Sequence, residues 1–174
     1  MILSAGNGNP KVLMKTTMGD ILLELYPEKA PISVENFLMY VDEKFYDGTI
    51  FHRVIKNFMI QGGGYTPALR PKRGKNAIMN EAGNGLSNKR GTLAMARGRP
   101  IHSASCQFYI NHVDNPGLDH KDDTMDGYGY AVFGKVIDGM DVVDAIASVK
   151  TMTKNDMNDV PRENIEIISV TRHK

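Results

Sequence analysis

The segment from Phe51 to Gly64, FHRVIKNFMIQGGG, combines groups that could bind a ligand. One cationic side chain, Arg53, and one amide, Gln61, stand among aromatic, methionine and aliphatic residues, and the segment ends in glycine. An apolar surface that carries a few well-placed hydrogen-bond donors is typical of a ligand groove. The alternative is an ordinary surface arginine on an edge strand, which is the commoner situation of a single Arg.

The alternation of residue types around Arg53 favours the groove. We expect TIFHRVI (49–55) to form a strand, with Phe51 and Arg53 on one face and His52 and Val54 on the other. Three further residues suited to a groove follow within one turn and one strand: Phe58, Met59 and Gln61. The pattern predicts an apolar groove with a cation at its side.

Phosphate-binding and metal-binding patterns are incomplete. Pro67 stands where a GxGxxG fingerprint needs its third glycine, so we expect the run Gly62–Gly64 to allow a sharp turn or a close approach. DHKDDTMDG resembles a calcium loop, but Thr124 and Phe133 occupy two of the ligand positions. Cys106 has no cysteine partner and the histidines are widely spaced, so we expect no metal site.

Nucleophilic and acid–base catalysis are not indicated. Cys106 lies between Ser105 and Gln107, and Ser103 follows His102, but neither spacing matches a nucleophile elbow or a protease signature. The sequence therefore contains no pattern from which we would predict a catalytic acid–base pair.

The composition of the chain limits its class and its partners. Its 174 residues suffice for one well-filled domain, and its net charge of +1 gives no reason to expect a nucleic acid or a membrane as partner. The longest apolar runs, such as Ile21–Leu23, are far too short to span a bilayer. No heptad pattern is visible, so we expect a monomer.

The N-terminus bears on the compartment of the protein. MILSAGNGNPK lacks the basic start and the long apolar core of a secretory signal, which favours the cytoplasm. The alternative is the periplasm, because Leu3-Ser4-Ala5 resembles the small-residue end of an export signal that has been removed.

The elements that must position Arg53 are mostly short strands. VLMKTTMGDILLEL predicts two strands joined by a tight turn at Met18–Asp20. Short strands are also expected in GTLAMAR, CQFYINH, YAVFGKV and NIEIISVTR, whereas residues 68–91 are typical of a loop. This order indicates an antiparallel barrel or sandwich rather than repeated βαβ units.

Two helices are expected, and we expect them to cover the open ends of the sheet. The first begins near Pro31 and has apolar residues at i, i+3, i+4 and i+7: Val34, Phe37, Leu38 and Val41. The second follows Asp138-Gly139 and has its own apolar set: Met140, Val143, Ile146 and Ala147.

FHRVIKNFMIQGG resembles the signature of the cyclophilins, the cyclosporin-binding family of peptidyl-prolyl cis-trans isomerases. The resemblance continues in TLAMAR, SCQFYIN, YAVFGKVIDGMDVVDAI and ISVTR, in family order, from about Val12 onward. MAR…SASCQFYINHVDN followed by GYGYAVFGKV is most similar to the bacterial members. It implies a mainly β fold, an eight-stranded antiparallel β-barrel capped by two α-helices. We expect this domain at residues 11–174, after a flexible extension at 1–10.

The resemblance also implies the residues of the site. A substrate proline ring would lie on four side chains: Phe58, Met59, Tyr109 and Leu118. Arg53 would be the catalytic residue and Gln61 would hydrogen-bond the peptide backbone. Three further residues would line or support the groove: Ala96, Gln107 and Tyr130.

Two departures from the commonest family pattern matter. Tyr109 stands where many members have Phe; Tyr130 stands where many have His, but bacterial members commonly have Tyr there as well. Gly117 stands where many members carry an aromatic residue, which in relatives that bind cyclosporin tightly forms a wall of the groove. The resemblance therefore implies an isomerase with weak cyclosporin binding.

The implied chemistry needs a rotation about one bond and no cofactor or metal. An amide rotates slowly because its C–N bond has partial double-bond character, with a barrier of about 18–20 kcal/mol. The prolyl nitrogen regains a lone pair when the amide twists, so a cationic donor aimed at that nitrogen stabilises the transition state selectively. The expected partners are proline-containing segments of unfolded or flexible proteins, and the expected role is to assist folding. The alternatives are a non-catalytic module that binds proline peptides and a holdase chaperone.

Overall fold

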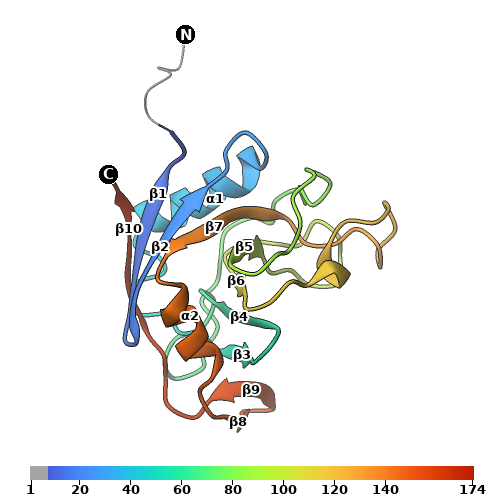
Figure 1. Ribbon diagram of the computed structural model, residues 1–174. Coiled ribbons are helices and arrows are strands. Elements are labelled where there is room, and N and C mark those ends of the chain that lie inside the picture. The colour runs from blue at the N-terminus through green and yellow to red at the C-terminus, as the bar shows by residue number, and fades with distance from the viewer. Residues whose placement is uncertain (1–7) are drawn as a thin grey trace.

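The computed structural model describes residues 8–174. Most of the extension predicted at 1–10 lies outside these residues. The chain is mainly β, and eight strands form one antiparallel sheet in the order β10-β1-β2-β7-β5-β6-β4-β3 (Figure 1). Their bounds are β1 Lys11–Thr16, β2 Gly19–Leu25, β3 Arg53–Ile55, β4 Met59–Gly62, β5 Thr92–Met95, β6 Phe108–Asn111, β7 Val132–Asp138 and β10 Ile167–His173.

The sheet curls until its two edges meet. Ile50 and Glu166, which precede the edge strands β3 and β10, form an antiparallel bridge. Backbone hydrogen bonds extend this seam, from Phe51 N to Ile165 O at 3.0 Å and from Ile167 N to Thr49 O at 2.7 Å. The predicted eight-stranded antiparallel barrel with two helices is confirmed.

The strands follow the alternation of the sequence. In β1, Val12 and Met14 are buried in the core whereas Lys11 and Lys15 are exposed. The turn between β1 and β2 comes earlier than predicted, at Thr17-Met18, because the strand resumes at Gly19. The Thr16 hydroxyl closes this turn, donating to Gly19 O at 2.7 Å and accepting from Met18 N at 3.1 Å.

The two predicted helices are confirmed as α1 (Pro31–Asp42) and α2 (Met140–Ala147), and they lie on different sides of the curled sheet (Figure 1). The predicted apolar face of α1 is buried. Its Phe37 ring meets Phe108 of β6 edge-on at 5.6 Å, which fixes the helix against the core.

One predicted face is wrong. Phe51 does not share a face with Arg53, because its side chain is fully buried in the core and packs edge-on against Phe108. The regular strand begins only at Arg53, and the seam hydrogen bonds draw the preceding residues into the closure of the barrel. His52 is buried as well, and its ring packs at a tilt against Tyr65 with ring centroids 4.4 Å apart.

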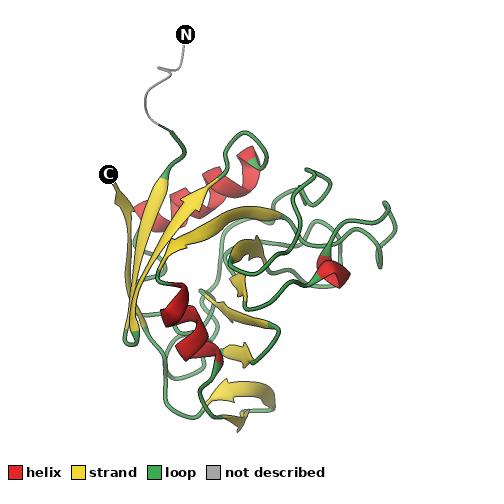
Figure 2. Cartoon of the chain, viewed as in Figure 1, coloured by secondary structure: helices red, strands yellow, loops and turns green. Residues whose placement is uncertain are grey.

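Three short elements were not predicted from the sequence. β8 (Thr151–Lys154) and β9 (Met157–Pro161) form a separate hairpin, seen at the bottom of Figure 2. Its tip, Asn155-Asp156, has positive φ at both residues, as a tight two-residue hairpin turn requires. The third element is the 3-10 helix η1 (Pro116–Leu118).

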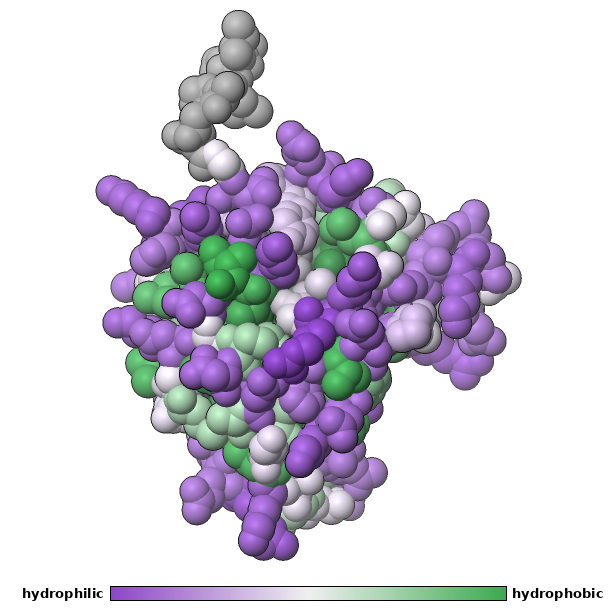
Figure 3. Space-filling model, in the orientation of Figure 1, coloured by the Kyte–Doolittle hydropathy of each residue, from purple (hydrophilic) through white to green (hydrophobic). Residues whose placement is uncertain are grey.

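The exterior is mostly hydrophilic on the face shown in Figure 3, where polar residues surround smaller apolar areas. Within residues 8–174, no helix has the length and apolar character needed to cross a membrane.

Candidate active site

One small cleft collects almost all of the residues singled out in the sequence. Its volume is about 120 Å³. The residues that line it are Arg53, Phe58, Met59, Gln61, Ala96, Arg97, Tyr109, Leu118 and Tyr130. Eight of these nine were predicted, and the ninth predicted residue, Gln107, lines an adjoining cavity of about 260 Å³.

The strand register explains why the polar residues meet. Gln61 of β4 is directly opposite Arg53 of β3 on one side and opposite Tyr109 of β6 on the other. Cross-strand partners point to the same face of a sheet, with Cβ atoms about 4.5–5.5 Å apart. Arg53, Gln61 and Tyr109 therefore form one row across three strands.

The apolar part of the cleft is a small cluster distinct from the main core. Met59, Ala94, Ala96, Tyr109 and Val132 are its buried members. The more exposed side chains that pack against it are Ile55, Phe58, Leu86, Leu118 and Tyr130. A surface of this shape and composition can hold a small apolar ring.

The side of the cleft towards Gln107 is polar. Gln61 Nε2 donates to Gln107 Oε1 at 2.9 Å, which fixes the orientation of both amides. The glycines of the run Gly62–Gly64 make room for this arrangement. A Cβ on Gly64 would overlap the Gln107 side chain, and Gly63 has a φ of +87° beside the rings of Phe108 and Tyr46.

Arg53 is exposed, and among residues 8–174 its guanidinium makes no ion pair and no side-chain hydrogen bond. Its charge is thus available to a ligand. Its neighbour His52 is different: burial, and secondarily the charge of Arg53, lowers the pKa of this imidazole to about 4. Burial raises the pKa of Tyr109 well above its usual value of 10.0.

Among the residues that the structure describes, no carboxylate and no imidazole line the cleft itself. The arrangement therefore offers a cation, amides and an apolar surface, but no acid–base pair. Within residues 8–174, no group of three or more His, Cys, Asp or Glu side chains is placed to hold a metal ion.

Arg97 is a lining residue that sequence reasoning missed. It borders both cavities, and its guanidinium lies 4.7 Å from the centroid of the Tyr130 ring while Nε donates to Gly129 O at 3.1 Å. A cation–π contact of this kind fixes the aromatic wall. No pattern in MAR distinguishes Arg97, because its position depends on the loop that returns from η1.

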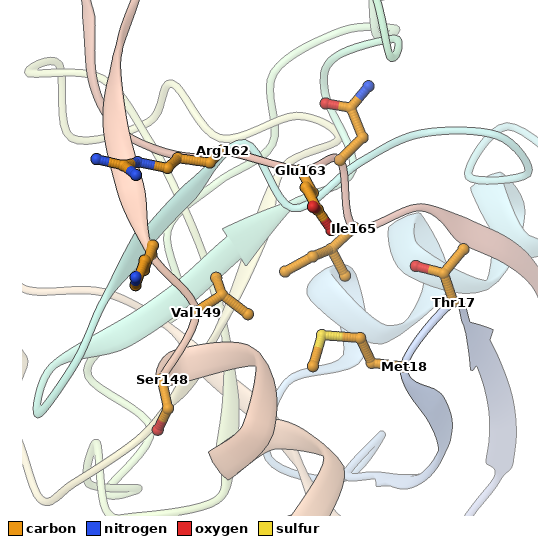
Figure 4. Close-up of a pocket in the computed structure, with 9 residues that line it drawn as sticks. Thr17, Met18, Ser148, Val149, Arg162, Glu163 and Ile165 are labelled. Atoms are coloured by element: carbon orange, nitrogen blue, oxygen red, sulfur yellow. The ribbon is translucent and has the colours of Figure 1, made fainter.

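A larger cavity of about 720 Å³ lies elsewhere, beside the β1–β2 turn and the end of α2 (Figure 4). Its labelled residues are Thr17, Met18, Ser148, Val149, Arg162, Glu163 and Ile165, and none of them belongs to the row of polar groups described above. It combines charged side chains of opposite sign with apolar ones, and its lining includes none of the predicted site residues. The smaller cleft is the better candidate because it places a few polar side chains directly beside an apolar pocket.

Comparisons with known proteins agree on one family. Residues 11–172 match the family described as cyclophilin type peptidyl-prolyl cis-trans isomerase/CLD. The chain is 52% identical over 160 residues to peptidyl-prolyl cis-trans isomerase B of Escherichia coli, covering 92% of this chain and 98% of that protein. It is 55% identical to a peptidyl-prolyl cis-trans isomerase of Acinetobacter baylyi, covering 93% and 85%.

A solved structure shows the same fold. The crystal structure of a cyclophilin type peptidyl-prolyl cis-trans isomerase of Cryptosporidium parvum, determined in the presence of the dipeptide Ala-Pro, superposes with a TM-score of 0.78. The two chains are 29% identical, and the match covers 94% of this chain and 99% of the other.

Proposed function

The chain belongs to the cyclophilin-type peptidyl-prolyl cis-trans isomerases, and we propose that the cleft around Arg53 is where it rotates Xaa-Pro peptide bonds. The observation that carries this proposal is the guanidinium of Arg53, which forms no ion pair within residues 8–174 and lies opposite Gln61, beside an apolar pocket. A cation without a protein partner is free to act on a group of the substrate.

The enzyme needs only to accelerate this rotation and does not need to shift its equilibrium. The cis and trans isomers of an Xaa-Pro bond differ by about 0.5–1 kcal/mol, whereas the rotation barrier is about 18–20 kcal/mol. At the top of that barrier the amide is twisted and the prolyl nitrogen carries a localised lone pair. Arg53 donates a hydrogen bond to that nitrogen, and because the planar amide offers no such acceptor, the bond stabilises the transition state selectively.

The rest of the cleft holds the substrate while one side of the bond turns. The proline ring lies in the pocket formed by Phe58, Met59, Tyr109 and Leu118. Gln61, which is oriented by its hydrogen bond to Gln107, hydrogen-bonds the peptide backbone. This contact prevents the substrate segments on the two sides of the Xaa-Pro bond from rotating together. No proton is transferred and no covalent bond is broken.

Proline-containing segments of unfolded or flexible proteins are the substrates that fit this site. The cleft is small and open at the surface, so it receives a single exposed ring with little flanking structure. The Cryptosporidium parvum relative was crystallised in the presence of Ala-Pro, which supports the same class of ligand here. Isomerisation of such segments would assist folding, since uncatalysed prolyl isomerisation is slow enough to limit it.

Cyclosporin binds weakly in this proposal. Gly117, in η1 beside Leu118, presents no side chain at the position where an aromatic wall would contact the inhibitor. A short substrate that reaches only the ring pocket and Arg53 does not need that wall. Inhibition and catalysis should therefore respond differently to changes at Gly117.

An isomerisation assay on a short Xaa-Pro peptide separates the enzyme from a binding module or a holdase. Arg53→Ala should lower kcat/KM at least ~10²-fold, which corresponds to about 2.7 kcal/mol of transition-state stabilisation. Arg70→Ala is the matched control, because Arg70 is also an exposed arginine but does not line the cleft. If Arg53→Ala retained more than half of the wild-type kcat/KM, Arg53 would not be the catalytic residue.

A further inference from the structure

A buried hydrogen-bond network lies beneath the proline pocket and connects most of its walls. Its centre is Asn88, which precedes β5 and is only 1% exposed. No pocket residue is adjacent to Asn88 in the sequence. The contacts between Asn88 and the pocket residues are therefore made by the tertiary fold.

The side-chain oxygen of Asn88 holds β6. Oδ1 accepts a hydrogen bond from the Tyr109 hydroxyl at 2.6 Å and another from Asn111 Nδ2 at 3.0 Å. Tyr109 is 4% exposed, so its hydroxyl would be buried without a partner if this acceptor were absent. The contact fixes the angle at which the Tyr109 ring enters the pocket.

The side-chain nitrogen of Asn88 holds the opposite wall. Nδ2 donates to Leu118 O at 3.2 Å and has a longer contact with Tyr130 O at 3.4 Å. It also donates to Asp119 Oδ1 at 3.0 Å, and the same oxygen accepts from Asn88 N at 2.6 Å. Because η1 has only three residues, these bonds determine where Leu118 stands relative to β6.

The network continues to the remaining aromatic residue of the pocket. Asn111 Oδ1 accepts from Asn115 Nδ2 at 2.8 Å, and Asn115 Nδ2 also donates to Phe58 O at 2.9 Å. The Asn115 backbone nitrogen donates to Asn88 O at 2.7 Å. The positions of Phe58, Tyr109, Leu118 and Tyr130 are thus coupled through one set of amides.

We propose that Asn88 is a positioning residue that sets the width of the proline pocket, an inference that rests on the proposed function of the cleft. Its side chain supplies an acceptor towards Tyr109 and a donor towards Leu118 in one rigid amide. A carboxylate would lose the donor, and an apolar residue would lose both. Tyr109 requires such an acceptor because it carries a hydroxyl that Phe lacks.

The test measures KM and kcat separately for Asn88→Ala, Tyr109→Phe and the double variant, well below their melting temperatures. A loosened pocket weakens ring binding equally in the ground and transition states, so KM should rise about tenfold in Asn88→Ala while kcat stays within about twofold. Tyr109→Phe, which keeps the ring, should raise KM about threefold. The double variant should be no worse than Asn88→Ala, because both changes break the same contact.

Thr49→Val is the control for the loss of a buried hydrogen bond as such. Thr49 is fully buried and donates to Tyr46 O at 2.7 Å, away from the cleft. It should lower the melting temperature and leave KM unchanged. An unchanged KM in Asn88→Ala, or in Tyr109→Phe if Asn88→Ala does not fold, would overturn the positioning role, as would additive effects in the double variant.

The Arg53→Ala assay keeps the two proposals apart. If Arg53→Ala lost activity and the Asn88 and Tyr109 variants kept the wild-type KM, only the positioning role would fail. If Arg53→Ala remained active, the assignment of the cleft itself would fail, and the role of Asn88 with it.

Discussion

His52 and Arg53 are adjacent in the chain, but one side chain is buried and the other is exposed. His52 is 5% exposed, and its Nδ1 is buried without a hydrogen-bond partner among the described residues. Burial first, and the charge of Arg53 second, lower its pKa from 6.5 to about 4. His52 is therefore neutral in the folded protein at pH values where the unfolded chain already binds a proton.

This pKa shift predicts acid destabilisation. As the pH falls from 6.5 towards 4, the unfolded state gains a proton that the folded state does not accept, so the free energy of unfolding falls. The loss of unfolding free energy is complete below the folded-state pKa of His52 and amounts to about 3 kcal/mol. In His52→Phe, which keeps a ring against Tyr65, this part of the loss should disappear.

Chemical denaturation at a series of pH values compares the two proteins. Asp42 and Asp144 have pKa values lowered chiefly by hydrogen bonds from Arg172 and Arg90, so their contributions are lost at lower pH and are the same in both proteins. Parallel curves for wild type and His52→Phe between pH 7 and about 4 would contradict the buried neutral state of His52.

Gly117 offers a test of inhibitor binding that leaves Arg53 and Gln61 unchanged. Its φ is not in the left-handed region and no heavy atom lies within 4 Å of an added Cβ, so the backbone accepts a side chain. Gly117→Trp should strengthen cyclosporin inhibition about 30-fold, because a buried aromatic contact is worth about 2 kcal/mol or more. Turnover of a short peptide should change little.

Inhibitor titrations of wild type and Gly117→Trp measure this effect. Gly117→Ala is the control, since it adds a Cβ without an aromatic ring. Nanomolar inhibition of the wild type would show that the groove needs no aromatic wall at this position.

At the scale of elements, helix α1 is capped from a distant loop. Its N-cap residue, Ala30, makes no side-chain hydrogen bond. Instead Glu81 accepts from the backbone nitrogen of Ser33 at 2.7 Å, from the Ser33 hydroxyl at 2.8 Å and from Ile32 N at 3.3 Å. A carboxylate at this end also complements the helix dipole. Glu81 therefore binds the loop that precedes β5 to the N-terminus of α1.

Glu81→Ala should lower the free energy of unfolding by about 1–2 kcal/mol, the usual cost of a lost helix cap with a charged acceptor. Glu35→Ala is the matched control, because Glu35 is an exposed glutamate on α1 that caps nothing. Thermal or denaturant unfolding measures both variants. Equal losses in the two would mean that Glu81 acts only through its charge.

The elements that the sequence predicted are those with a regular apolar pattern. The helices and the main strands carry buried residues at the expected spacing, as Val12 and Met14 do in β1. The β8–β9 hairpin was missed because it lies outside the barrel and its Met152 and Thr153 are both exposed. Phe51 was assigned to the wrong face because seam closure, a long-range contact, overrides the local alternation.

At the scale of the whole molecule, the cleft is assembled from four separate stretches of the chain. Arg53, Phe58, Met59 and Gln61 were predicted from the local residue pattern, whereas the other predicted residues of the cleft came only from the family resemblance. Asn88 and Arg97 could not be predicted in this way, because their roles depend on contacts with Tyr109 and Tyr130 that no local pattern encodes.

The most direct measurement is exchange NMR on a short Xaa-Pro peptide with wild type and Arg53→Ala, recorded at matched occupancy of the site. In the proposed mechanism Arg53 acts only on the twisted amide, so the variant should still bind the peptide, with Kd within about threefold of the wild type and shifted signals for Met59 and Leu118. The catalysed cis-trans exchange rate should fall at least ~10²-fold. Exchange at the wild-type rate in bound Arg53→Ala, or loss of binding and exchange to the same extent, would contradict a role confined to the transition state.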